Sequence, residues 1–151
     1  MGKSTRKTQA KGGEVRERVL EDHDVLRGLL DGIEALSEHF EAGDADVAEK
    51  LRAQGIEFYE RFAEHLRLED RILAPAVAAR EKPGEHKLEA LVHEHQEQRE
   101  LLEYLLGRLQ KQPLPTVLMA QELRSFAEYV RRDMMHEEKT LLDEAILGRE
   151  S

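Results

Sequence analysis

Apolar residues recur at every third or fourth position along four stretches of this chain, which is the spacing of one face of an amphipathic helix. Breaks that contain glycine or proline separate the stretches, at 41–44, 81–85 and 112–115. The pattern predicts helices over about 14–41, 45–80, 85–110 and 115–148. Because short connections place consecutive helices side by side and antiparallel, we expect an all-α, up-down-up-down antiparallel four-helix bundle.

The two halves of the chain resemble each other. The stretch EDHDVLRGLLDGI (21–33) aligns with HEHQEQRELLEYL (93–105), and HLRLEDRILAPA (65–76) aligns with DMMHEEKTLLDE (133–144). The alignment pairs His23 with His95, His65 with Asp133, Glu69 with Glu137 and Asp70 with Glu138. We interpret the chain as a duplicated helical hairpin in which candidate ligands fall on all four helices.

Ionisable residues interrupt the apolar stripe of every predicted helix, at positions where Leu or Ile is typical of such a stripe. These residues are His23, His65, Glu69, His95, Asp133 and Glu137. Burying such a group without a partner costs several kcal/mol. We therefore expect these side chains either to pair with one another or to bind a ligand.

The same residues are predicted to lie at one level of the bundle. At about 1.5 Å per residue, His23 and His65 both lie roughly 30–33 Å from the first break. His95 and Asp133 both lie roughly 27–30 Å from the third break. The ionisable residues thus converge on one layer.

A layer of imidazoles and carboxylates between facing helices is how helical bundles build di-metal sites. The chain contains no Cys, and an imidazole and carboxylate donor set without thiolate favours iron or manganese, with zinc as a further candidate. The four-residue spacing of His65 and Glu69 puts both on one helix face, so the carboxylate can bridge two ions while the imidazole binds one of them.

Four stretches share one pattern in order along the chain: EDHDVLRGLL, HLRLEDRILAP, HEHQEQRELLEYL and HEEKTLLDEA. Together they resemble the hemerythrin-like family, also called HHE cation-binding domains, across about residues 16–147. The resemblance implies a non-haem di-iron centre, with two ions bridged by oxo, hydroxo or carboxylate groups. The ligands that it implies are His23, His65 and His95, with Glu69 as one bridge and Glu137 or Glu138 as the second.

The chain departs from the oxygen-carrying members of that family at two positions. Leu91 stands where they have a second histidine one turn before the position of His95. Asp133 stands where they have a histidine on the fourth helix. Because a larger share of carboxylate ligands favours the ferric state, we expect peroxide turnover or ferrous-iron oxidation rather than reversible oxygen carriage.

Three residues of the fourth predicted helix have alternative placements. Asp133 either binds metal or forms a buried ion pair with Arg99. Glu138 lies further to the side of the stripe than Glu137 and is either a ligand or an ordinary surface residue. His136 is rotated roughly 60° from Asp133 on a helical wheel, so it points to solvent unless a kink swings it inward.

The resemblance implies binding or sensing of oxygen, nitric oxide or peroxide chemistry, or iron storage or sensing. We expect a metal-binding protein that acts on a small diatomic molecule or peroxide and, if it is an enzyme, a di-iron oxidoreductase. The alternatives are a non-enzymatic iron sensor or buffer and a metal-free helical interaction domain whose polar layer fixes helix register. We expect a monomer or a dimer, with any protein partner left open.

Composition and charge bear on the partners and the location that we expect for the protein. The net charge of −9 argues against nucleic acid as a partner, and no stretch approaches the length of a transmembrane helix. Residues 1–13 carry four basic and no acidic side chains, so we expect a disordered basic tail before a bundle over 14–148. The absence of Cys fits a cytoplasmic protein, which is the location we expect.

Overall fold

The structure is a computed structural model that describes residues 11–143 and 147. In this part of the chain all regular secondary structure is helical. The long helices are α2 (Gly12–Glu41), α3 (Ala48–Leu68), α5 (Lys87–Lys111) and α6 (Val117–Lys139). The short elements are η1 (Ala45–Val47), η2 (Glu69–Leu73) and α4 (Ala74–Arg80). The prediction of an all-α protein with four long helical segments is confirmed.

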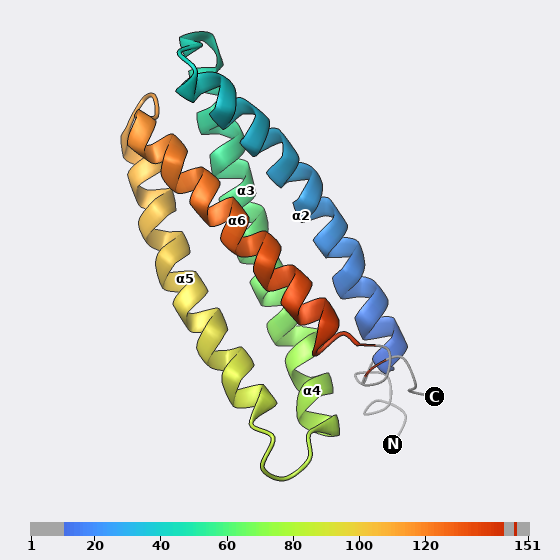
Figure 1. Cartoon of the computed structure of the whole chain (residues 1–151). Helices are drawn as coiled ribbons and strands as arrows, with labels where there is room; N and C mark the ends of the chain where they lie inside the picture. The colour runs from blue at the N-terminus through green and yellow to red at the C-terminus, as the bar shows by residue number, and fades with distance from the viewer. Residues whose placement is uncertain (1–10, 144–146, 148–151) are drawn as a thin grey trace, which may run out of the picture.

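The helices lie alongside one another in one bundle (Figure 1). The connections that follow α2 and α5 lie at the upper end of Figure 1, and the connection that follows α4 lies at the lower end. Within the described residues, none of the helices contains a stretch that is long and apolar enough to cross a membrane.

The first helix begins earlier than the sequence predicts. Gly12 and Gly13 already belong to α2, so the helix takes in the end of the predicted tail. Lys11 immediately precedes the helix, and residues 1–10 of the predicted tail lie outside the described residues.

The second predicted helix, 45–80, is interrupted in the structure. Residues 69–73 form a π-helical turn, in which the N–H of Ala74 bonds to the carbonyl of Glu69, five residues back. Pro75 follows this turn, and in a regular α-helix its ring would clash with the carbonyl four residues earlier. The wider turn accommodates the proline, and it begins at the carboxylate that the sequence singles out as a bridge.

The fourth helix ends at Lys139 rather than near residue 148. The hydroxyl of Thr140 donates to the carbonyl of His136, and the N–H of Leu142 bonds to the carbonyl of Glu137. Arg16 of α2 then holds the chain by donating from Nε to the carbonyl of Leu142 at 2.8 Å. Residues 144–146 and 148 of the predicted helix lie outside the described residues.

Two hydrophobic clusters fill the described part of the bundle. The larger contains Leu26, Leu30, Phe58, Phe62, Phe126 and Val130, among others. The smaller contains Val15, Val19, Leu73, Ala76, Val77, Leu91, Leu142 and Leu147. On α2, His23 falls between Val19 of the smaller cluster and Leu26 of the larger one, so a polar layer separates the two clusters.

Candidate metal centre

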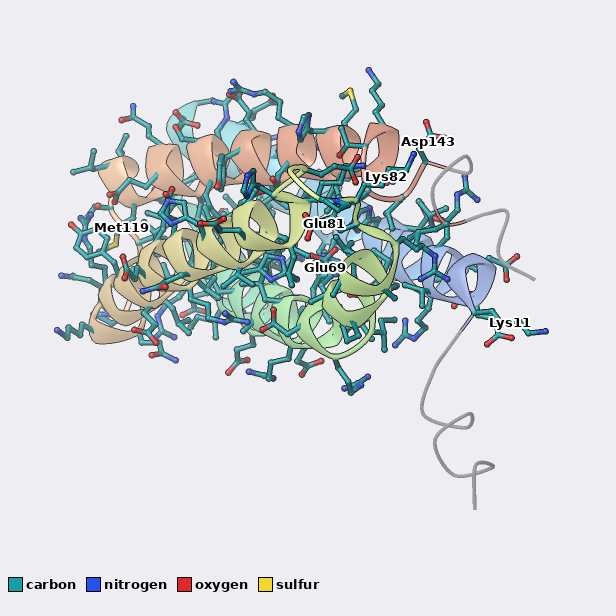
Figure 2. All side chains as sticks on the ribbon, turned by 90° about the horizontal axis from the view of Figure 1, so that it is seen from below. Lys11, Glu69, Glu81, Lys82, Met119 and Asp143 are labelled. Carbon is teal, nitrogen blue, oxygen red and sulfur yellow. The ribbon has the colours of Figure 1, made fainter. Side chains whose placement is uncertain are left out.

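Four side chains from three of the long helical segments meet in the polar layer. They are His23 of α2, His65 of α3, Glu69 at the start of η2 and Glu137 of α6, and one ligand atom from each lies within 4.8 Å of all the others. Glu69 lies among the helices in the view from below (Figure 2), and its exposed fraction is 1%. The fold therefore gathers the imidazole and carboxylate donors that the sequence pattern indicates.

Three separations within this cluster are close to those of ligands that share an ion. His65 Nε2 lies 3.0 Å from Glu69 Oε2, and His23 Nε2 lies 3.0 Å from Glu137 Oε1 and 3.6 Å from Glu69 Oε2. Ligand atoms about 2.1 Å from a common ion are about 3.0 Å apart at right angles and about 3.4 Å apart in a tetrahedron. The donor atoms are thus spaced for a cation between them.

Three atoms of the cluster are buried without a hydrogen-bond partner. They are His23 Nε2, Glu69 Oε2 and Glu137 Oε1. Such an orphaned polar atom costs about 1–3 kcal/mol when nothing satisfies it. All three belong to the four-residue cluster, so a bound cation would satisfy them together.

His95 of α5 approaches the same carboxylate from the other side. Its Nε2 lies 2.9 Å from Glu69 Oε1, while Glu69 Oε2 faces His65 and His23. The two oxygens of Glu69 therefore face imidazoles on different helices. This is the geometry in which a carboxylate can bridge two ions.

A second layer of carboxylates orients the three histidines. The Nδ1 atoms of His23, His65 and His95 lie 2.7, 2.7 and 2.8 Å from Glu138 Oε2, Asp22 Oδ2 and Asp70 Oδ1, respectively. In a neutral imidazole that donates from Nδ1, the lone pair remains on Nε2. Each histidine thus directs its metal-binding nitrogen to the centre, as carboxylate–histidine–metal triads do.

Arginines hold these outer carboxylates in place. Arg27 donates to both oxygens of Glu138 at 2.8 and 2.7 Å. Arg61 donates to Asp22, and Arg99 donates to Asp70. Each outer carboxylate therefore bonds to a histidine on one side and to an arginine on the other, which fixes the orientation of the imidazole.

The buried groups of the cluster shift one another's pKa values. Burial alone would lower the pKa of His65, but the charge of Glu69 and the hydrogen bond to Asp22 raise it to about 9. Burial would raise the pKa of Glu69, yet the neighbouring carboxyl of Glu137 and the charge of His65 hold it well below its ordinary value. Burial and the charge of Glu69 raise the pKa of Glu137 well above its ordinary value. Of the two buried carboxyls, Glu69 is therefore the more acidic and Glu137 the less acidic.

The internal repeat is visible in the contacts of the centre. His23 pairs with Glu137 and Glu138 of α6, and its repeat equivalent His95 pairs in the same way with Glu69 and Asp70. Arg27 and Arg99, which also align in the repeat, bind Glu138 and Asp70. The duplicated hairpins thus build two matching halves around the layer.

The three other candidate ligands on α6, Asp133, His136 and Glu138, lie outside the four-residue cluster. Asp133 is half-buried and accepts a hydrogen bond from Gln98 Nε2 at 2.9 Å, and it does not join the four-residue cluster. The alternative of an ion pair between Asp133 and Arg99 is not the one observed, because the guanidinium of Arg99 binds Asp70 instead. His136 is exposed, as its angle on the wheel indicates. Glu138 lies in the outer layer beside His23.

Sequence reasoning named one member of the outer layer, Glu138, as a candidate ligand but missed the roles of Asp22 and Asp70. Asp22 is 1% exposed and Asp70 binds His95, yet neither lies at the centre of an apolar stripe. One feature of the sequence could have identified these carboxylates: each lies next to a predicted ligand. They are Asp22, Asp70 and Glu138. The alignment of Arg27 with Arg99 in the repeat is a second signal for their arginine partners.

Residues 15–145 match the sequence profile of the family described as hemerythrin HHE cation binding domain. No curated protein and no solved structure matched the chain. The family match and the buried His/Glu cluster agree on a metal-binding domain.

Proposed function

The chain belongs to the hemerythrin HHE cation-binding family, and on that premise we propose that its centre holds two iron ions and acts on a small oxidant. The oxidant is oxygen, peroxide or nitric oxide. The short connections and the arrangement in Figure 1 support an up-down-up-down order for the helices that carry the ligands.

One observation supports metal binding above the others: His23 Nε2, Glu69 Oε2 and Glu137 Oε1 are buried and orphaned in one cluster. A layer that served only to fix helix register would gain nothing from leaving these atoms without partners. A cation satisfies all three at once. His95 and the second oxygen of Glu69 support a place for a second ion.

The donor set supports iron. The centre offers three imidazoles and two inner carboxylates, and the chain contains no Cys. Imidazole suits iron, copper and zinc, and carboxylate suits harder ions, so a mixed set without thiolate favours iron or manganese. Zinc remains the alternative that metal analysis distinguishes.

The chain's own residues orient and shield the site, and the iron, when bound, supplies the redox chemistry. The ring of Phe62 stacks on His65 with centroids 5.9 Å apart. Leu26 and Leu66 are fully buried in the adjoining cluster. These side chains exclude water from one side of the layer, while the outer carboxylates hold the imidazoles in position.

We further propose peroxide turnover or ferrous-iron oxidation as the reaction, which would make the protein a di-iron oxidoreductase. Leu91 is buried one turn before His95 and provides no nitrogen ligand. Asp133 bonds to Gln98 and likewise adds no imidazole. The resulting share of oxygen donors favours the ferric state over reversible oxygen carriage.

The test is spectroscopic. The protein loaded with Fe(II) under argon is exposed to oxygen or to peroxide, and the visible spectrum is followed with and without azide. We expect oxidation to a ferric form that binds azide and does not return to the diferrous form when oxygen is removed. A stable, reversible oxygen adduct of the diferrous protein would contradict the proposed reaction.

An iron sensor or buffer is the second candidate, and one observation favours it. Glu69 and Glu137 are both buried in the same cluster, so a cation relieves the repulsion that full ionisation of both would cause. This function requires metal-dependent stability without turnover. A sensor or buffer would bind iron normally, but the iron-loaded protein would consume peroxide no faster than free iron does. This result distinguishes it from an oxidoreductase.

A further inference from the structure

One residue of the four-residue cluster also lines a surface cavity. Glu137 lines a cavity of about 260 Å³ between α5 and α6, which His23, His65 and Glu69 do not line. Glu137 is also the most exposed member, at 7% against 2% or less for the others. Because Glu137 lines the cavity while its Oε1 lies 3.0 Å from His23 Nε2, this side chain links the cavity to the centre.

Two further carboxylates face this cavity from opposite helices. Glu94 of α5 and Asp133 of α6 line it together with the exposed imidazole of His136. Lys87 contributes one positive charge to the lining, against the two carboxylates of Glu94 and Asp133. Asp133 is held in place by Gln98 Nε2 at 2.9 Å. A cavity of this volume with such a lining admits water and attracts cations.

The internal repeat explains why the cavity lies on this side. Asp22 and His65 bond to each other at 2.7 Å and close the first half of the layer. Their equivalents in the alignment are Glu94 and Asp133, which line the cavity instead. Where the first half has an imidazole and a carboxylate that bond to each other, the second half thus has two carboxylates that face the cavity.

We propose that Glu94 and Asp133 form a transient binding site for a hydrated divalent cation, from which the ion reaches Glu137 and the buried centre. The proposal rests on the proposed metal-binding function and adds the route by which the centre is loaded. Carboxylates with half-exposed positions bind and release a hydrated ion more readily than the buried ligands of the centre.

The rate of cation uptake tests the route. Metal-free protein is mixed with Co(II) at low ionic strength in a stopped-flow instrument, and the visible absorption of ligated Co(II) is followed. We expect Glu94→Gln with Asp133→Asn to lower the second-order rate constant about tenfold, with the final Co(II) content unchanged. The control pair is Glu103→Gln with Glu128→Gln, which removes equal charge from exposed positions on the same two helices.

A steric variant tests whether cations pass through the cavity without changing the charge of its lining. Ala90 lines the cavity and is exposed, so Ala90→Phe narrows the cavity without altering a ligand or a charge. We expect slower uptake in Ala90→Phe and normal uptake in Ala78→Phe, a substitution at an exposed position on α4.

Three results would be decisive against parts of the account. Uptake rates equal to those of the control pair would overturn the loading route. A lower final Co(II) content in Glu94→Gln with Asp133→Asn would make these residues permanent ligands and also overturn it. Absence of bound metal in the unmodified protein at any time would instead refute the proposed function itself.

Discussion

At the residue scale, each histidine of the centre has two different tasks for its two nitrogens. Nε2 of His65 faces Glu69 at 3.0 Å, and Nδ1 bonds to Asp22 at 2.7 Å. Asp22 in turn binds Arg61. Because the outer carboxylate fixes both the tautomer and the ring orientation, metal affinity depends on residues that do not touch the metal.

The two aspartates that flank His23 in the sequence allow a matched test of this outer layer. The side chain of Asp22 is 1% exposed and bonds to His65, whereas that of Asp24 is 79% exposed. We expect Asp22→Asn to weaken cation affinity about 10- to 100-fold and Asp24→Asn to leave it unchanged. Competition with a chelator of known affinity measures both, and equal affinities in the two variants would refute the role of the outer layer.

At the element scale, the helices follow from apolar periodicity, but the interruption at η2 does not. Pro75 is visible in the sequence, yet a proline after a helical stretch is equally consistent with a simple helix end. The widened turn becomes apparent only when α4 is seen to continue past it. In the same way, the stripe locates His23 and Glu69, whereas the partner of Asp133 depends on which helix faces which.

Alanine substitutions at two glycines of the long helices are expected to change the stability of the protein in opposite directions. A Cβ on Gly55 of α3 would lie 2.8 Å from Leu109 Cδ2 and within 3.3 Å of Leu123, whereas nothing lies within 4 Å of one on Gly28 of α2. Alanine has the higher helix propensity, so we expect Gly28→Ala to raise the free energy of unfolding by up to about 1 kcal/mol. We expect Gly55→Ala to lower it by about 1–3 kcal/mol, because α3 must move away from α5 and α6. Urea denaturation measures both, and equal stabilisation would show that the helices are not packed this closely.

At the scale of the whole molecule, the polar layer divides the hydrophobic interior. Leu26 and Leu30 belong to one cluster, and Val15 and Val19 belong to the other. His23, His65 and Glu137 come from three helices, so a cation at their centre joins elements that apolar packing holds together only above and below. Metal binding is therefore expected to stabilise the whole bundle.

Thermal unfolding tests this coupling. At a free-cation concentration of 100 times Kd, binding to the folded state alone adds about 2.7 kcal/mol to the free energy of unfolding. We expect Tm to rise with added Fe(II) under argon and to return to the metal-free value with excess chelator. A Tm that does not change with metal or chelator would favour a metal-free interaction domain.

Iron content after anaerobic loading tests the central claim most directly. The protein is incubated with Fe(II) under argon, freed of unbound metal by gel filtration, and its iron per chain is measured beside His65→Ala and the exposed control His93→Ala. We predict two ions per chain in the unmodified protein and in His93→Ala, and a clear loss in His65→Ala. An unmodified protein that retains no iron, or a His65→Ala variant that retains as much as the unmodified protein, would contradict the account.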